Sequence, residues 1–132
     1  MKWKEIPKID AHAHLVTKDF REFFKDDKES CWTYSNKSYF KQIAKEYNVK
    51  KFILQPTNDT YMYQETVTNN NWLASQVKQS NGLFLAFADI QNNGAYILDV
   101  APNHLEIAIK DNGLSGLKIH PNNLNIPFDD LR

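Results

Sequence analysis

Short, nearly continuous apolar runs alternate along the chain with amphipathic stretches, and this alternation leaves few folds open. Four runs are typical of buried strands: residues 8–15, 51–55, 83–90 and 117–120. A run such as Phe52-Ile53-Leu54 is apolar throughout rather than alternating in polarity. That pattern favours strands covered on both faces, as in parallel sheets.

Helical patterns separate these runs. Apolar residues at helical spacing predict helices around residues 40–47, 72–77 and 105–109. Asn103 is the expected N-cap of the last helix, and Asn112-Gly113 its expected end. The charged and aromatic stretch 18–38 is expected to form a partly helical excursion after the first strand. The predicted order β-α-β-α-β-α-β indicates an α/β fold with a parallel sheet, in a single domain covering residues 1–132.

Charge and composition narrow the choice of partners. Lys+Arg and Asp+Glu both total 16, so the formal net charge is +0 and nothing draws the chain toward nucleic acid or acidic membranes. No apolar run is long enough to span a bilayer. The single cysteine, Cys31, cannot form an internal disulfide, which favours a reducing compartment. We therefore expect a cytoplasmic protein that acts on a small molecule, with neither a nucleic-acid nor a membrane partner.

The first predicted strand carries a His-x-His pair, His12 and His14. Side chains at i and i+2 of a strand point to the same face, so the two imidazoles should project together, with Asp10 one step deeper. Imidazole suits zinc and other first-row metals. The pair also falls at the carboxyl end of a strand, where (β/α) barrels form their sites. We predict one divalent ion there, zinc or alternatively manganese. Asp10 is a candidate outer-sphere partner or additional ligand. The alternative is that the two histidines are incidental.

Two stretches resemble a known family. Residues 9–14, Ile-Asp-Ala-His-Ala-His, resemble the opening of the amidohydrolase superfamily. Residues 116–121, Gly-Leu-Lys-Ile-His-Pro, and the later Phe128-Asp129-Asp130 resemble its amidohydrolase-2 type branch, which is related to aminocarboxymuconate-semialdehyde decarboxylase. The resemblance runs from about Lys8 to Arg132. TatD-type deoxyribonucleases and PHP phosphoesterases also open with His-x-His, but their further motifs are not evident here, and such a phosphoesterase remains the less favoured alternative.

This resemblance implies a distorted TIM barrel with a metal ion at its mouth, held first by His12 and His14. In that family, further ligands and acid–base residues come from strands five, six and eight. The metal lowers the pKa of a bound water and polarises a carbonyl group. The implied reaction is hydrolysis of a C–N or ester-like bond, or in some members non-oxidative decarboxylation.

Lys118 and His120 share a face of the fourth predicted strand. Some amidohydrolases carry a carboxylated lysine at the matching place, so Lys118 is a lower-ranked metal ligand, and a polar contact near the barrel mouth is its alternative. His120 could bind metal or substrate, or simply pack before Pro121. Four more residues follow the second and third predicted strands and could face the site: Gln55, Asn58, Asp89 and Gln91. No catalytic acid or base is assigned.

Length limits the fold that these strands can complete. A TIM barrel takes about 250 residues, and four strands in 132 residues make about half of one. We therefore expect the N-terminal half of a (β/α)8 TIM barrel, incomplete as an enzyme. The alternative is a non-catalytic half-barrel that serves as an assembly or binding module. Open sheet edges invite pairing, so a homo-oligomer is expected in either case.

Overall fold

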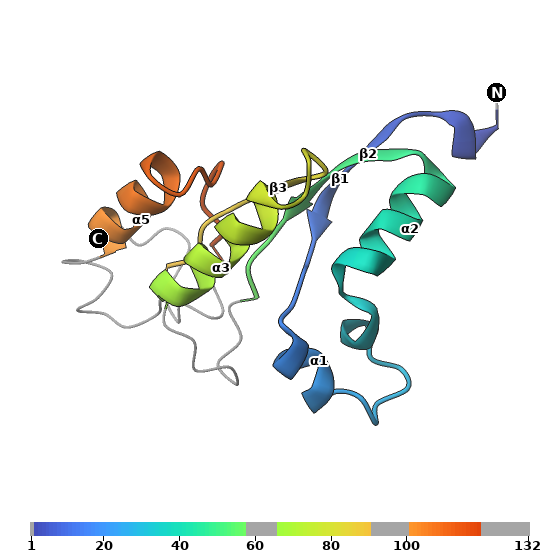
Figure 1. Ribbon diagram of the computed structural model, residues 1–132, viewed down its shortest axis with the longest axis horizontal. Coiled ribbons are helices and arrows are strands. Elements are labelled where there is room, and N and C mark those ends of the chain that lie inside the picture. The colour runs from blue at the N-terminus through green and yellow to red at the C-terminus, as the bar shows by residue number, and fades with distance from the viewer. Residues whose placement is uncertain (1, 58–65, 91–100, 120–132) are drawn as a thin grey trace.

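The computed structural model describes residues 2–57, 66–90 and 101–119 (Figure 1). Strands and helices alternate along the chain, as the sequence predicts. In order, the elements are η1 (Trp3–Glu5), β1 (Lys8–Ala13), α1 (Lys18–Phe23), η2 (Cys31–Tyr34), α2 (Lys37–Tyr47), β2 (Val49–Leu54), α3 (Thr66–Lys78), β3 (Phe84–Ala86) and α5 (Ala101–Lys110). Among the described residues, no helix is both long and apolar enough to cross a membrane.

The strands form one parallel sheet in the order β1-β2-β3. Phe52 of β2 lies opposite Asp10 of β1 on one side and Phe84 of β3 on the other. The predicted fourth strand is present only as a parallel bridge between Ala88 and Leu117. Around it, Ala88 N donates to Gly116 O at 2.7 Å and Lys118 N donates to Ala88 O at 2.9 Å. Ser115 N also donates to Ala86 O of β3 at 2.8 Å, so residues 115–118 lie along the end of the sheet. The parallel α/β architecture is confirmed.

β1 departs from a regular ladder. Its step from Asp10 to Ala13 matches the shorter step from Phe52 to Leu54 on β2, so β1 carries an extra residue at this point. Such a bulge interrupts the strict alternation of side chains. The prediction that Asp10 shares a face with His12 assumed an uninterrupted strand, and that assumption is wrong across the bulge. The strand also ends at Ala13, before the predicted limit.

Helix ends follow local chemistry. The Asn36 side chain accepts a hydrogen bond from Tyr39 N at 3.1 Å and caps α2, while Asn48 ends the helix in the left-handed region at φ 57°. α5 begins at Ala101, so the prediction of Asn103 as its N-cap is wrong. Pro102 falls in the first turn of α5, where its missing N–H costs nothing, and the helix can therefore start earlier. Gly113, at φ 75°, follows the end of α5 as predicted.

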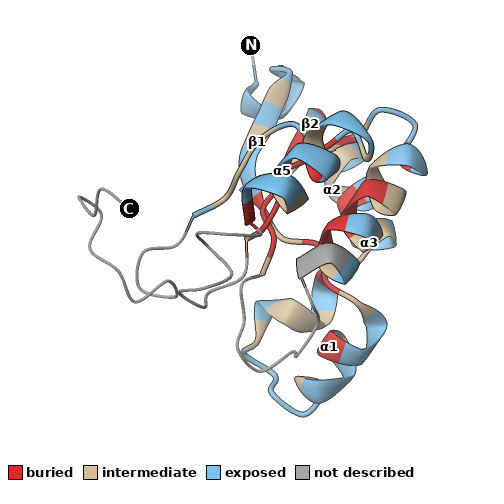
Figure 2. Cartoon of the chain, turned by 90° about the vertical axis from the view of Figure 1, so that its left-hand side faces the viewer, coloured by how far each residue is buried: buried red, intermediate tan, exposed pale blue. Residues whose placement is uncertain are grey.

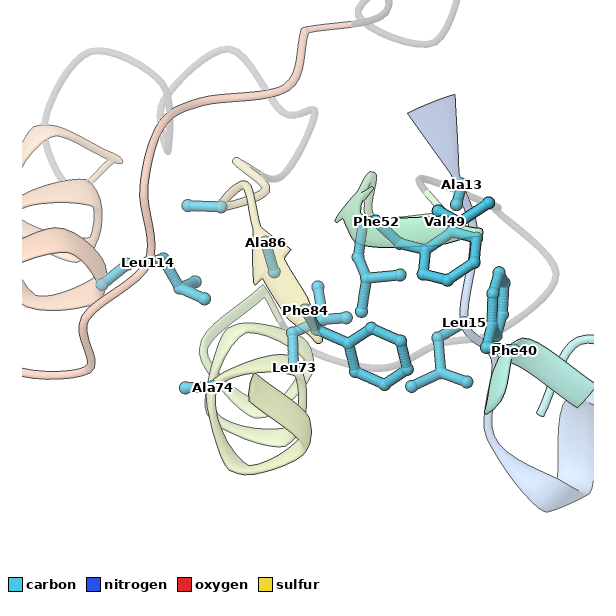
Figure 3. Close-up of a cluster of buried hydrophobic side chains, with 13 residues drawn as sticks. Ala13, Leu15, Phe40, Val49, Phe52, Leu73, Ala74, Phe84, Ala86 and Leu114 are labelled. Carbon is cyan, nitrogen blue, oxygen red and sulfur yellow. The ribbon is translucent and has the colours of Figure 1, made fainter. Parts of the chain in front are cut away.

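The core lies between the sheet and helices α2 and α3 (Figure 3). Phe52 and Leu54 of β2, on one face of the strand, are almost completely buried. The Phe40 ring of α2 packs with its centroid 4.9 Å from that of Phe52 and 5.8 Å from that of Phe84, in edge-to-face geometry. Leu73 of α3 completes this cluster. Figure 2 shows buried residues on β2 and α3, whereas β1 is mostly exposed or intermediate and α1 is largely exposed around its buried Phe20.

Candidate metal centre

His12 and His14 lie at the carboxyl end of β1. His12 is inside the strand and exposed, and His14 follows its last residue and is half-buried. Because all three strands are parallel, Gln55 after β2 and Asp89 after β3 come to the same end of the sheet. Both of these residues are buried. That their side chains face the histidine pair stays a prediction. His120, Asn58 and Gln91 lie outside the described residues.

The two imidazoles converge. The Nε2 atoms of His12 and His14 are 3.0 Å apart, and the ring planes make an angle of 64°. For Zn–N distances of roughly 2.0–2.1 Å, this separation of 3.0 Å corresponds to an N–Zn–N angle of about 95°. Such an angle suits two neighbouring positions in the coordination sphere of one ion. The pair therefore fits two ligands of a single divalent metal.

The orientation of His14 is set by a backbone group. Its Nδ1 lies 2.9 Å from the carbonyl oxygen of Gln55. A carbonyl oxygen can only accept, so Nδ1 must carry the hydrogen, and in the neutral ring the lone pair is on Nε2. Metal-binding histidines are usually oriented in this way by a partner on the other ring nitrogen. In the absence of metal, His12 Nε2–H can then donate to His14 Nε2.

Asp10 acts on the backbone of this site. Its Oδ1 accepts a hydrogen bond from His12 N at 3.0 Å. The partner of the His14 ring is the Gln55 carbonyl, and the Gln55 side-chain Nε2 donates to Ala11 O at 3.4 Å. Asp10 and Gln55 thus hold the short segment that carries both imidazoles. The sequence did not point to this carbonyl, because every residue has one.

Burial lowers the pKa of His14 below its ordinary value, and the neighbouring charges of His12 and Lys118 act in the same direction. The hydrogen bond to the Gln55 carbonyl opposes them. A lowered pKa keeps the imidazole neutral and able to bind metal at pH 7. The effect of Lys118 also shows that this lysine lies within electrostatic reach of the pair.

An aromatic wall stands beside His14. The Trp32 ring of η2 meets the imidazole edge-to-face with centroids 5.5 Å apart, and Phe20 of α1 packs against the same indole at 5.4 Å. Ser35 Oγ donates to the carbonyl oxygen of His14. The excursion predicted for residues 18–38 therefore covers one side of the site. Trp32 went unnoticed in the sequence because it lies in a mainly polar stretch without periodicity.

In the described ranges, no group of three or more His, Cys, Asp or Glu side chains is placed to hold a metal ion. The His12–His14 pair supplies two protein ligands, whereas a catalytic zinc usually has three and a water.

Asp89 is only 8% exposed, and burial raises its carboxyl pKa to about 6, although hydrogen bonds from Ile90 N and the Asn69 side chain act in the opposite direction. The Asn70 amide also holds the Asp89 backbone, with Nδ2 donating to Asp89 O at 3.0 Å and Oδ1 accepting from Asp89 N at 2.8 Å.

Comparison with solved structures supports the barrel. The chain is similar to the crystal structure of 2,6-dihydroxybenzoate decarboxylase complexed with 2,6-dihydroxybenzoate, with a TM-score of 0.63 and 16% sequence identity. The match covers 84% of this chain and 38% of the other, which is a TIM barrel. At this identity the likeness concerns the fold, and it confirms that this chain has the architecture of part of a TIM barrel. No family model and no curated protein matches the sequence.

Proposed function

We propose that this chain provides the first metal-binding strand of an amidohydrolase-2 type enzyme and that His12 and His14 hold one divalent ion, zinc in the first instance and manganese as the alternative. The observation that carries the proposal is the convergence of the two Nε2 atoms at 3.0 Å, with the His14 lone pair fixed toward the gap by the Gln55 carbonyl. Two histidines without a common ligand do not require that their Nε2 atoms converge. The two sequence motifs and the barrel fold support the same family.

The ion, when bound, would lower the pKa of a water molecule and polarise a carbonyl or carboxylate of a small-molecule substrate. The chain's own residues have simpler tasks. His12 and His14 bind the ion, Gln55 keeps Nδ1 of His14 protonated, and Trp32 with Phe20 shields one side from water. Hydrolysis of a C–N or ester-like bond is the first reaction to test, and decarboxylation, which the name of the structural neighbour states for that protein, is the second.

A non-catalytic role is the second candidate. It is favoured because the described residues offer only two ligands, His12 and His14. Two imidazoles can bind a metal ion, but they do not complete the coordination sphere that a catalytic zinc usually has. On this reading the chain is a binding or assembly module. The cytoplasm is the proposed location for either function, and the free, exposed thiol of Cys31 supports a reducing compartment.

Zinc titration of the metal-free protein by calorimetry tests the site, with manganese titrated in parallel. We expect saturable binding that weakens at least about tenfold in His12→Ala and in His14→Ala, the lower end of what loss of even an outer-sphere partner costs. His104→Ala is the matched control, because this half-buried histidine lies on α5 away from the pair. Circular dichroism confirms that each variant is folded.

The outcomes separate the candidates. Equal affinity in all four proteins, or no saturable binding to the parent, would overturn the metal site. Binding that needs both histidines, followed by turnover of amide, ester or aromatic carboxylate substrates, supports the enzyme. The same binding without turnover supports the module. Turnover of DNA or phosphate esters alone would instead point to a phosphoesterase.

A further inference from the structure

A cavity lies next to the segment that follows the histidine pair, and Leu15 and Val16 are among its lining residues. Its volume is about 390 Å³, and it opens between the start of α1, the start of α2 and one side of α3. The residues of its wall that can meet a ligand with charged, polar or aromatic groups are Lys18, Arg21, Lys37, Ser38, Trp72 and Gln76. The volume is at the lower end of the range for small-molecule sites.

The charged side chains that line this cavity are all positive. Lys18, Arg21 and Lys37 all line the cavity, and no acidic residue is among its lining residues. Within the described ranges, the direct ion pairs use other lysines, namely Lys4, Lys25 and Lys110, although Lys18 lies within electrostatic reach of Glu22 on α1. Three cations around one hollow repel each other unless an anion sits between them. The cavity therefore has the electrostatics of an anion site.

Arg21 is held in place for such a role. Its Nη1 donates to Val16 O at 2.6 Å and to Ser35 O at 3.4 Å. In the described part of the chain its hydrogen bonds use Nη1, which leaves Nη2 and Nε for a ligand. Guanidinium groups bind phosphate through paired N–H donors, and an anchored one loses little freedom on binding.

The other walls add complementary groups. Lys37 Nζ donates to Gln79 Oε1 at 2.7 Å, which ties α2 to the end of α3 and fixes this cation at the rim. Lys37 and Ser38 begin the 11-residue helix α2, so their backbone N–H groups carry the positive end of its dipole. Half-buried Trp72 offers a flat apolar surface to the uncharged remainder of a ligand.

We propose that this cavity binds the phosphate group of a small phosphorylated molecule, with Arg21, Lys37 and Lys18 around the phosphate and Trp72 against the organic part. A phosphate dianion matches three cations better than a single carboxylate does, and the arginine fork favours it further. His12 and His14 are not among the lining residues of the cavity, so the phosphate site and the metal site can be tested with different variants.

The test is an NMR titration of the full chain at constant ionic strength with inorganic phosphate, phenyl phosphate and acetate. We expect saturable shifts of the Lys37 and Ser38 amides and of the Trp72 indole N–H, with tighter binding of phenyl phosphate than of inorganic phosphate. Lys37→Gln should weaken phosphate about tenfold, the typical effect of one charge-assisted hydrogen bond. Lys41→Gln is the matched control, an exposed lysine on α2 outside the cavity.

Three results would overturn the proposal. The first is the absence of saturable shifts at these positions. The second is equal weakening in Lys41→Gln and Lys37→Gln, because then general charge attraction explains the binding. The third is acetate that binds as tightly as phosphate. Amide spectra of each variant that overlay on those of the parent outside the cavity exclude unfolding as the cause of any loss.

Discussion

Nδ1 of His14 and the carbonyl oxygen of Gln55, 2.9 Å apart, join the residue after β1 to the residue after β2. Gln55 N also donates to Ala13 O at 2.7 Å, so both polar groups of one peptide residue are bonded to the end of β1. The imidazole is thereby tied to the sheet rather than to a mobile side chain. The behaviour of His14 in solution follows from this bond and from its burial.

At pH 7, metal-free His14 should be neutral with its hydrogen on Nδ1. Its pKa should lie below 6.5, because burial disfavours the charged ring. A group whose folded pKa is lowered binds fewer protons in the folded state, so its contribution to stability is lost as pH falls from about 6.5 through the folded value. Long-range ¹H–¹⁵N spectra recorded against pH measure both the tautomer and the pKa. An Nε2–H tautomer or a pKa above 6.5 would contradict the geometry.

Asp89 should give the opposite pH dependence. Its pKa is raised from 3.8 to about 6 by burial, so the folded protein holds the proton more tightly than the unfolded chain does. Stability is therefore highest below pH 4 on this account and falls as pH rises through about 6, by at most about 3 kcal/mol. Urea unfolding from pH 4 to pH 7 measures this slope. Asp89→Asn should flatten it, and His14→Gln should not. A slope that persists in Asp89→Asn would show that another group causes it.

Asn70→Ala should destabilise the fold by about 2–4 kcal/mol, because it removes the two hydrogen bonds that the Asn70 side chain makes with the buried N–H and C=O of Asp89. Asn71→Ala is the neighbouring control. Asn71 is exposed, and its side chain accepts a hydrogen bond from Asn112 Nδ2, so its loss should cost less than about 1 kcal/mol. Urea unfolding at one pH compares the two. Equal effects would mean that the Asn70–Asp89 pairing adds nothing specific.

The β1 edge should mediate self-association, the partner being a second copy of the chain. β1 is an outer strand of the described sheet, and Ile9 on it is 64% exposed. Open edges pair readily, and a lysine there opposes pairing. Sedimentation velocity should show a concentration-dependent dimer that Ile9→Lys removes. Ile107→Lys on α5, at a residue 46% exposed, is the control and should leave the dimer intact. A monomer at all concentrations would refute this interface.

Much of the fold could be predicted from sequence because periodicity reports burial. The spacing of Phe40, Ile43 and Tyr47 gave α2 nearly to its ends, and the apolar run around Phe52 gave β2. Features that depend on backbone hydrogen bonds could not be predicted from periodicity. The bulge in β1, the early start of α5 at Ala101 and the single bridge at Leu117 depend on which N–H meets which C=O.

The same distinction holds for the candidate site: side chains in a sequence pattern could be predicted, and backbone groups and tertiary contacts could not. His12 and His14 were identifiable because histidines two apart on a strand can bind one metal ion together. Their Nε2 atoms lie 3.0 Å apart, and metal binding by the pair stays a prediction. The Gln55 carbonyl and Trp32 escaped notice, because one is a backbone group and the other reaches His14 only through tertiary packing. Lys118 lies within electrostatic reach of the pair, and its part in binding a metal stays a prediction, as does that of His120.

His14 and Gln55 lie 41 positions apart in the sequence, so their hydrogen bond depends on how the first two strands pair. Carbonyl groups along a strand point alternately to either side, so a one-residue slip of β2 against β1 would turn the Gln55 carbonyl away from the imidazole. His14 would then lose the partner that keeps its Nε2 lone pair free. If the pair binds a metal ion as proposed, a chain whose first two strands pair out of register would bind that ion more weakly than the correctly paired chain.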